Sequence, residues 1–157
     1  MRHLPTFGFK ALAAIALLAG MAVCGPAMAD NQNGQGQSGL GQAWPNAPDV
    51  SSSPRWHVYV FVRNGIRYVQ VNDLNGNVRA AFAAHGGNFL VLPIGTDASR
   101  VATPQDPQPA PANTQGEIVY QDSDVKVQVT PQANSVMTLQ AVDSTCNDPV
   151  ECSSRVN

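Results

Sequence analysis

Three two-residue turns in close succession limit the folds open to this chain more than any other feature. They are Asn64-Gly65, Asn75-Gly76 and Gly86-Gly87, and each separates two runs of β-branched, aromatic or small apolar residues. Asn-Gly and Gly-Gly dipeptides favour the tight turns of β-hairpins. The spacing therefore predicts an antiparallel meander of four strands, over residues 55–63, 66–72, 78–84 and 88–94.

The registers that these turns impose agree with one another. The first turn pairs Val60 with Val69, the second pairs Val69 with Phe82, and the third pairs Phe82 with Val91. A register error of one residue would exchange the two faces of a strand, yet all three turns place apolar side chains on the same face. We expect that face to belong to the core, with Trp56, Val58, Val60, Val62, Val69, Val71, Val78, Ala80, Phe82, Ala84, Phe89 and Val91.

Strand patterns resume after residue 115 and predict a second meander. Its three strands are expected at residues 116–120, 125–130 and 135–142. Their turns predict the pairs Ile118 with Val127, Tyr120 with Val125, Val129 with Met137, and Val127 with Leu139. The other face of the middle strand is polar, with Lys126, Gln128 and Thr130. We expect that face to be open to water.

Two segments of low apolar content flank the first meander. Residues 95–115 are rich in Pro, Ala, Gln and Asn, a composition typical of an extended connection. Residues 30–54 are mostly Gly, Gln, Asn, Ser and Pro, and they hold too little apolar surface to offset their ordering entropy. We expect a flexible leader there. Residues 55–157 are predicted to form a single all-β domain, with the two meanders packed as a small sandwich or partly open barrel.

The N-terminus carries the three zones of an export signal. Arg2 and Lys10 supply positive charge, residues 11–23 are apolar, and small residues occupy the positions that a signal peptidase reads, ending at Ala29. We expect residues 1–29 to be removed between Ala29 and Asp30. The form of the cleavage site is typical of bacteria. The mature protein would then act in the periplasm or outside the cell, and would have no membrane anchor.

Two cysteines remain after that cleavage, Cys146 and Cys152. In an oxidising compartment two cysteines so close in sequence usually pair, so we predict a disulfide. A metal site is the alternative, but it needs more ligands at fixed spacing, and neither His57 nor His85 lies nearby in sequence. No cofactor or metal is expected.

Charge is unevenly distributed along the predicted mature chain, whose net charge is −4. Residues 55–100 have a net charge of +3, and residues 101–157 have a net charge of −5. Either the two halves face each other and neutralise their charges, or the surface is bipolar and orients a partner; we favour the first interpretation. No long basic run is present, so a nucleic-acid partner is not expected.

Enzyme motifs are not evident in the sequence. Neither a G-x-S-x-G nor an H-E-x-x-H motif occurs, and no glycine loop has the pattern of a phosphate cradle. Asp122, Asp124 and Asp143 could bind Ca²⁺, although acidic residues at such positions more often form turns. The sequence leaves open whether the chain is an enzyme, although the lack of such motifs favours a non-catalytic protein.

The strongest candidate for a binding site is an aromatic group on the outer face of the first two strands. Phe61 lies across from Tyr68, and Tyr59 is the next residue along on the same face; Arg63, Gln70 and Asn72 flank them. We call Tyr59, Phe61, Arg63, Tyr68 and Gln70 the platform. If exposed, the platform suits a sugar ring or a protein. The alternative is that these residues are buried as cross-strand pairs or beneath another segment.

Two functional hypotheses follow. The first is an exported, non-catalytic binding module whose partner is an unidentified protein or a polymer of the cell envelope. The second is a small exported hydrolase, or an inhibitor of one, whose residues are dispersed along the chain. A cleft joining His57 or His85 to a carboxylate within hydrogen-bond reach would favour the second hypothesis. The oligomeric state is left open.

Overall fold

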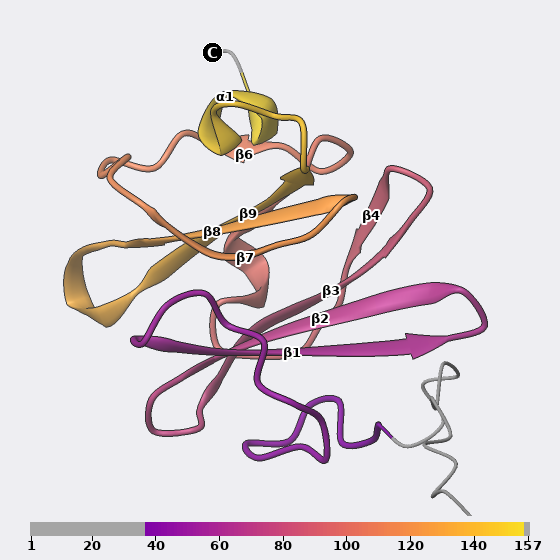
Figure 1. The fold of residues 1–157 in the computed structure, drawn as a ribbon. Coiled ribbons are helices and arrows are strands. Elements are labelled where there is room, and N and C mark those ends of the chain that lie inside the picture. Colours follow the sequence, from indigo (N-terminus) through magenta and orange to yellow (C-terminus); the bar gives the residue numbers. More distant parts are fainter. Residues whose placement is uncertain (1–36, 156–157) are drawn as a thin grey trace, which may run out of the picture. The chain divides into compact units, whose positions relative to one another are not determined.

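The computed structural model describes residues 37–155 of the chain. The predicted signal and its cleavage site at Ala29 and Asp30 lie outside the described residues. Two β-sheets, one above the other in Figure 1, make up most of the described chain. The all-β class is therefore confirmed, and the described strands do not close into a barrel.

The first sheet is the predicted four-stranded meander. It contains β1 (Trp56–Arg63), β2 (Ile66–Asp73), β3 (Val78–His85) and β4 (Asn88–Val91), antiparallel and in that order. The three predicted registers are confirmed. Asn64 and Gly65 both have positive φ angles, 53° and 78°, as the tight turn requires. The fourth strand ends at Val91 rather than at Ile94, because Pro93 has no N–H to extend the ladder.

The second sheet contains the predicted meander and one additional strand. Its order is β5 (Val101–Ala102), β9 (Met137–Asp143), β8 (Val125–Pro131) and β7 (Glu117–Gln121). The short strand β5 is parallel to β9 and makes the sheet mixed. It comes from the Pro-rich connection, which also contains the short helix η1 (Ala98–Arg100) and the strand β6 (Gln108–Pro109). The inner faces of the two sheets share one core, made of Trp56, Val58, Val69, Val71, Ala80, Phe82, Ala84, Phe89, Val101, Val119, Val125, Val127, Val129, Leu139 and Ala141.

The predicted registers of the second meander are wrong. Val129 pairs with Leu139 and Val127 with Ala141, two residues away from the prediction. The loop before β9 is longer than expected, because the Gln132 N–H bonds the Val136 carbonyl across the short helix η2 (Ala133–Ser135). Between β7 and β8 a bulge pairs Ile118 with Gln128 and Tyr120 with Val127. A shift of two residues keeps each side chain on its face, so the β8 and β9 core residues are still those that the pattern indicated.

The outer face of β8 is covered, contrary to the expectation that it would face water. Gln128 and Thr130 are buried, and Gly116 of the Pro-rich connection lies against both side chains. Figure 1 shows β6 and the helix α1 (Pro149–Ser153) on the side of β8 and β9 away from the first sheet. Burial is possible because the polar groups satisfy one another: the Gln128 amide donates to Thr130, whose hydroxyl donates to Gln140.

A disulfide fastens this cover. The predicted Cys146–Cys152 bond is present and spans the N-terminus of α1, which Asp148 caps by accepting hydrogen bonds from the N–H groups of Val150 and Glu151. Directly after α1, strand β10 (Ser154–Arg155) pairs with β6 in a small parallel sheet. The C-terminal segment therefore holds the Pro-rich connection in place over the second sheet.

Residues 37–54 are the described part of the predicted flexible leader of residues 30–54, and in the structure they are hydrogen-bonded to both sheets. Residues 38–50 lie on the first sheet, and we call them the strap. The Val50 N–H bonds the Val58 carbonyl of β1, and the Ser52 N–H bonds the Val119 carbonyl of β7. This polar segment is ordered by hydrogen bonds to the two sheets rather than by burial of its own apolar side chains, which is why its composition did not reveal it.

Candidate functional site

The structure buries much of the predicted platform. Tyr59 and Phe61 are only 5% and 6% exposed, and Gln70 is fully buried. Tyr68 is half-buried and Arg63 is exposed. The rings of Tyr59 and Phe61 are therefore not open to a sugar, which matches the alternative of buried cross-strand pairs.

Two buried amides of β2 hold the strap over the platform. Gln70 accepts from the Gly41 N–H at 2.6 Å and donates to the Gln42 carbonyl at 2.8 Å. Asn72 donates to the Ala43 carbonyl at 2.7 Å. All three strap groups belong to the main chain, so these contacts depend on the path of the strap more than on its side chains.

His57 lies within reach of a carboxylate, as the hydrolase hypothesis requires. Its Nδ1 is 2.6 Å from Asp49 Oδ2, and its ring contacts the edge of Trp44. Burial acts to raise the pKa of Asp49, but the hydrogen bonds from His57, Val58 and Ser51 hold it below the ordinary value. Asp49 thus also ties the strap to β1. Within residues 37–155 no serine or cysteine side chain hydrogen-bonds to His57.

The outer edge of β1 is only partly protected. In a hairpin with a two-residue turn, alternate residues point their main-chain groups away from the partner strand. In β1 these residues are Val58, Val60 and Val62, as the bond from the Val50 N–H to the Val58 carbonyl shows. The strap pairs as far as the bridge between Asp49 and Tyr59. Pro48 has no N–H and cannot continue the ladder.

Val62 therefore lies on an open stretch of sheet edge. In the described part of the chain, no hydrogen bond joins its main chain to another segment, and the residue is 43% exposed. By contrast, the Gln105 side chain covers part of the β4 edge, where it accepts from the Phe89 N–H and donates to the Gly87 carbonyl. Unpaired edge groups are a template for another strand.

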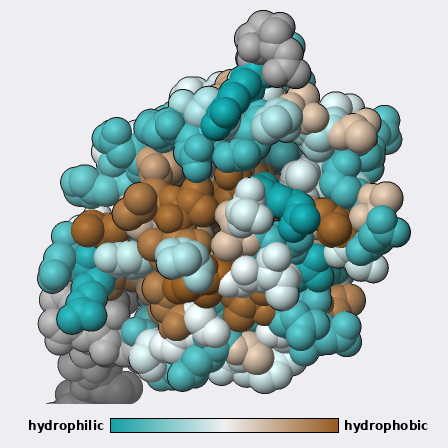
Figure 2. Space-filling model, turned by 180° about the vertical axis from the view of Figure 1, so that it is seen from behind, coloured by the Kyte–Doolittle hydropathy of each residue, from teal (hydrophilic) through white to brown (hydrophobic). Residues whose placement is uncertain are grey.

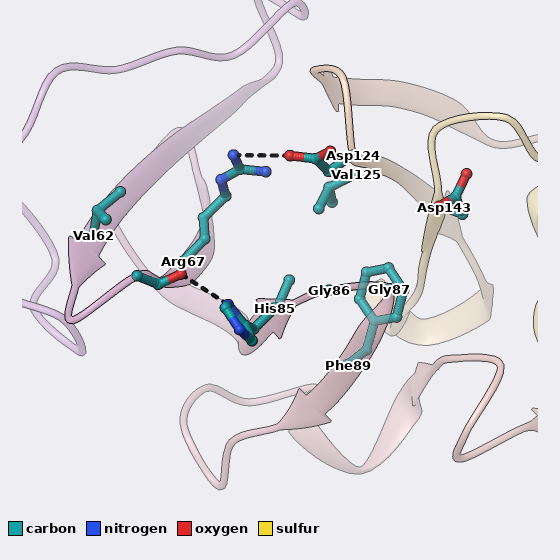
Figure 3. Close-up of a pocket in the computed structure, with 11 residues that line it drawn as sticks. Val62, Arg67, His85, Gly86, Gly87, Phe89, Asp124, Val125 and Asp143 are labelled. Carbon is teal, nitrogen blue, oxygen red and sulfur yellow. Dashed lines mark hydrogen bonds and ion pairs between the residues drawn. The ribbon is translucent and has the colours of Figure 1, made fainter.

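A cleft of about 220 Å³ opens beside Val62, at the end of the two sheets. Figure 3 shows Val62, Arg67, His85 and Phe89 of the first sheet facing Asp124, Val125 and Asp143 of the second. The remaining lining residues are Gly65, Ala84, Gly86 and Gly87, so two of the hairpin turns border the opening. The cleft combines an apolar interior with charged groups at its rim.

Arg67 joins the two sheets across this cleft. Its guanidinium is 2.8 Å from Asp122 and 3.3 Å from Asp124. A second ion pair, Arg55 with Glu117 at 2.8 Å, also links the sheets. These contacts support the interpretation that the basic and acidic halves of the chain face each other.

Two carboxylates at or near the cleft, Asp122 and Asp143, have pKa values below the ordinary value. Hydrogen bonds from the Thr145 hydroxyl and N–H lower the pKa of Asp143. Burial acts to raise the pKa of Asp122, but hydrogen bonds from Tyr120 and from the main chain, together with Arg67, lower it below its ordinary value. His85 is tied differently, with Nδ1 3.0 Å from the Gly65 carbonyl oxygen. Among the described residues, no three His, Cys, Asp or Glu side chains are grouped to hold a metal ion.

Hydrophobic residues gather on the face of the molecule opposite to the view of Figure 1, as Figure 2 shows. Among residues 37–155, the most exposed large apolar side chain is Leu90 of β4, at 65%. It belongs to a row that crosses the outer face of the first sheet, in which Phe61 pairs with Tyr68, Tyr68 with Ala83, and Ala83 with Leu90. The row is buried at β1 and exposed at β4.

Comparison with protein-family models, with curated proteins and with solved structures found no match. Among residues 37–155, no helix is both long enough and apolar enough to cross a membrane. Sequence reasoning did not find the cleft. One feature of the sequence could have indicated the cleft. Arg67 is a charged residue on an otherwise apolar strand face, and the turn at Asp122–Asp124 is acidic.

Proposed function

We propose that this chain is an exported, non-catalytic binding module that takes up an extended segment of a partner protein as an added strand on β1. The observation that carries the proposal is the open edge at Val62, which lies beside the cleft. Strand addition uses main-chain hydrogen bonds for affinity and flanking pockets for specificity. The unpaired main-chain groups of Val62 would supply the hydrogen bonds, and the cleft beside Val62 would supply the pocket.

A protein fits this surface better than an envelope polysaccharide. The groups that β1 offers are a main-chain N–H and carbonyl oxygens at strand spacing, which match another peptide chain. A polysaccharide would instead need exposed aromatic rings, and Tyr59 and Phe61 are buried. Of the platform residues, Arg63 is the most accessible to such a partner, because it is exposed and directly follows Val62.

Export is supported by two independent features. The N-terminus has the zones of a signal peptide, and the Cys146–Cys152 disulfide is of a kind that persists in oxidising compartments. We therefore propose that the mature protein acts in the periplasm or the medium.

The decisive variant is Val62→Pro. The Val62 N–H points away from β2, so proline removes an edge donor without breaking the bonds between β1 and β2. Val62→Ala is the matched control, because it shortens the side chain and keeps the N–H. The probe is the peptide acetyl-Thr-Val-Lys-Val-Thr-amide, titrated into the ¹⁵N-labelled mature protein and followed by NMR.

We expect saturable shifts centred on residues 60–63 in the wild type and in Val62→Ala, and none in Val62→Pro. Shifts that are the same in Val62→Pro would contradict strand addition. So would protection of the Val62 amide that rises with protein concentration in the absence of peptide, because a second copy of the chain would then occupy the edge. Shifts with soluble peptidoglycan fragments but not with the peptide would favour an envelope polymer.

The hydrolase hypothesis keeps one specific observation, the short contact between His57 and Asp49. Its test is hydrolysis of p-nitrophenyl acetate and of peptidoglycan by the wild type and by His57→Asn. Turnover that His57→Asn abolishes, with its fold intact by NMR, would replace the binding proposal. We expect both proteins to give the rate of the uncatalysed reaction, because no nucleophile hydrogen-bonds to His57 in the described structure.

A further inference from the structure

We infer that the cleft is the specificity pocket of this binding site and that it receives a lysine or arginine side chain from the added strand. The inference rests on the proposed function and adds the chemistry of the partner. It follows from the direction in which an added strand would point its side chains and from the charge balance of the cleft.

Strand geometry aims one side chain of the partner at the cleft. Side chains of residues paired directly across two strands lie on the same face of the sheet. Val62 lines the cleft, so a partner residue paired with Val62 has its side chain on the cleft side. The neighbouring partner residues point to the other face, beside Phe61 and the exposed Arg63.

The charge balance at the cleft favours a cation. Asp124 and Asp143 line the cleft, and Asp122 shares the guanidinium of the lining residue Arg67 with Asp124. Asp124 is still largely exposed, since 65% of its side chain is accessible. The basic groups are Arg67 and, next to Asp143, Lys126, whose ammonium donates to the Cys146 carbonyl. Three carboxylates therefore stand against two basic side chains, so negative charge is in excess.

The interior of the cleft fits the stem of a long basic side chain. Its apolar lining comes from Val62, Ala84, Phe89 and Val125. Lysine and arginine bury their methylene stems along apolar surface while the charged head stays at a polar rim. A glutamate would bring a like charge to Asp124 and Asp143, and an aliphatic side chain would leave the rim unused.

The test compares three peptides that differ only at the central residue: lysine, norleucine and glutamate in acetyl-Thr-Val-Xaa-Val-Thr-amide. The protein variants are Asp143→Asn and the double variant Asp124→Asn, Asp143→Asn. Glu151→Gln is the matched control, because it removes one negative charge from an exposed residue outside the cleft. NMR titration gives the dissociation constant of each pair.

We expect the lysine peptide to bind about 10-fold more tightly than the norleucine peptide, the factor that about 1.4 kcal/mol represents, and the glutamate peptide to bind most weakly. The double variant should remove the advantage of lysine, and Glu151→Gln should keep it. The advantage should also shrink at high salt.

The outcomes separate this inference from the proposed function. Equal binding of all three peptides, still abolished by Val62→Pro, would overturn the basic pocket and leave strand addition standing. Binding of none of the peptides would overturn both. A lysine advantage unchanged in the double variant would place the selecting charge elsewhere and also overturn the inference.

Discussion

Val62 and Phe61 are neighbours in β1, yet their roles differ because their main chains point in opposite directions. The main chain of Phe61 bonds β2, whereas that of Val62 faces the open edge. Their side chains alternate too, Phe61 to the outer face and Val62 to the cleft. The predicted platform was a set of side chains that includes Phe61. The feature that supports a binding function is instead the main chain of the next residue, Val62.

The most buried charge in the described structure belongs to Asp97. It is 2% exposed, bonds the Arg79 guanidinium at 2.6 Å and accepts from the Met137 N–H at 3.2 Å. We predict that Arg79→Leu lowers the free energy of unfolding by about 3–5 kcal/mol, because it leaves a buried carboxylate without its partner. Urea unfolding followed by circular dichroism measures this loss.

Arg100 provides a matched comparison. Its guanidinium also contacts the Asp97 carboxylate, at 3.6 Å, but the Arg100 side chain is half exposed. Arg100→Ala should cost less than about 1 kcal/mol, as expected for an exposed ion pair. Equal losses for Arg79→Leu and Arg100→Ala would show that burial of Asp97 does not govern the energetics of this cluster.

A second prediction at the residue scale concerns the amide that holds the strap. Gln70→Ala removes both of its bonds to the strap and should cost about 1–3 kcal/mol, the penalty for leaving buried polar groups unsatisfied. Hydrogen exchange measured by mass spectrometry should show faster deuterium uptake in residues 38–50. Gln42→Ala is the control, because the strap uses the Gln42 carbonyl of the main chain; accelerated exchange in that variant would contradict the main-chain account.

At the scale of elements, the first meander was predictable and the second only in part. Turns such as Asn64-Gly65 determine register locally, and three of them agree. The loop at residues 132–136 contains Asn134 and Ser135 with positive φ angles, and a loop of this kind leaves the register of the flanking strands undetermined. Apolar alternation in β8 still identified the core face, because a shift of two residues preserves it.

The strap and the cover of the second sheet were not predictable from composition. Both are polar segments that bind through main-chain groups, as with the Gln70 contacts, or bury polar side chains that satisfy each other, as with Gln128 and Thr130. Hydrophobic patterning does not report such contacts. The cleft was missed for a related reason, since it depends on residues from both sheets, such as Arg67 and Asp143.

The disulfide acts at this scale, because it closes the segment that carries α1 and β10. We predict that Cys146→Ser with Cys152→Ser lowers the free energy of unfolding by roughly 2 kcal/mol, the value expected for so short a loop. Faster hydrogen exchange should be confined to residues 105–116 and 146–155, and the first sheet should be unaffected. Loss of protection throughout β1–β4 would contradict a local role for the disulfide.

For the whole molecule, carboxylates determine the response to acid. The pKa values of Asp49, Asp73, Asp122 and Asp143 lie below their ordinary value of 3.8 in the folded state. The unfolded chain therefore binds more protons as pH falls. The stability that these groups contribute is complete well above pH 3.8 and is lost as pH drops through the lower folded values.

At alkaline pH, the stability depends on Tyr120, whose pKa is shifted upward rather than downward. Burial and the 2.5 Å bond from its hydroxyl to Asp122 raise its pKa above the ordinary 10.0. Its contribution is complete below pH 10 and is lost above it. We predict a melting temperature that is nearly constant from about pH 5 to pH 9 and falls on both sides. Tyr120→Phe should weaken the alkaline fall; an unchanged alkaline limb would contradict the assignment.

The most direct test of the open edge is the hydrogen-exchange rate of single β1 amides in the free mature protein, measured by NMR. Phe61 and Arg63 donate to β2, so their amides should be strongly protected, whereas the Val62 amide should exchange at least about 10-fold faster because nothing in the described chain accepts its hydrogen bond. Addition of the lysine peptide should slow exchange at Val62 alone among these three. Protection of Val62 equal to that of Phe61 in the free monomer would show that the edge is already occupied, and the proposed binding site would then not exist.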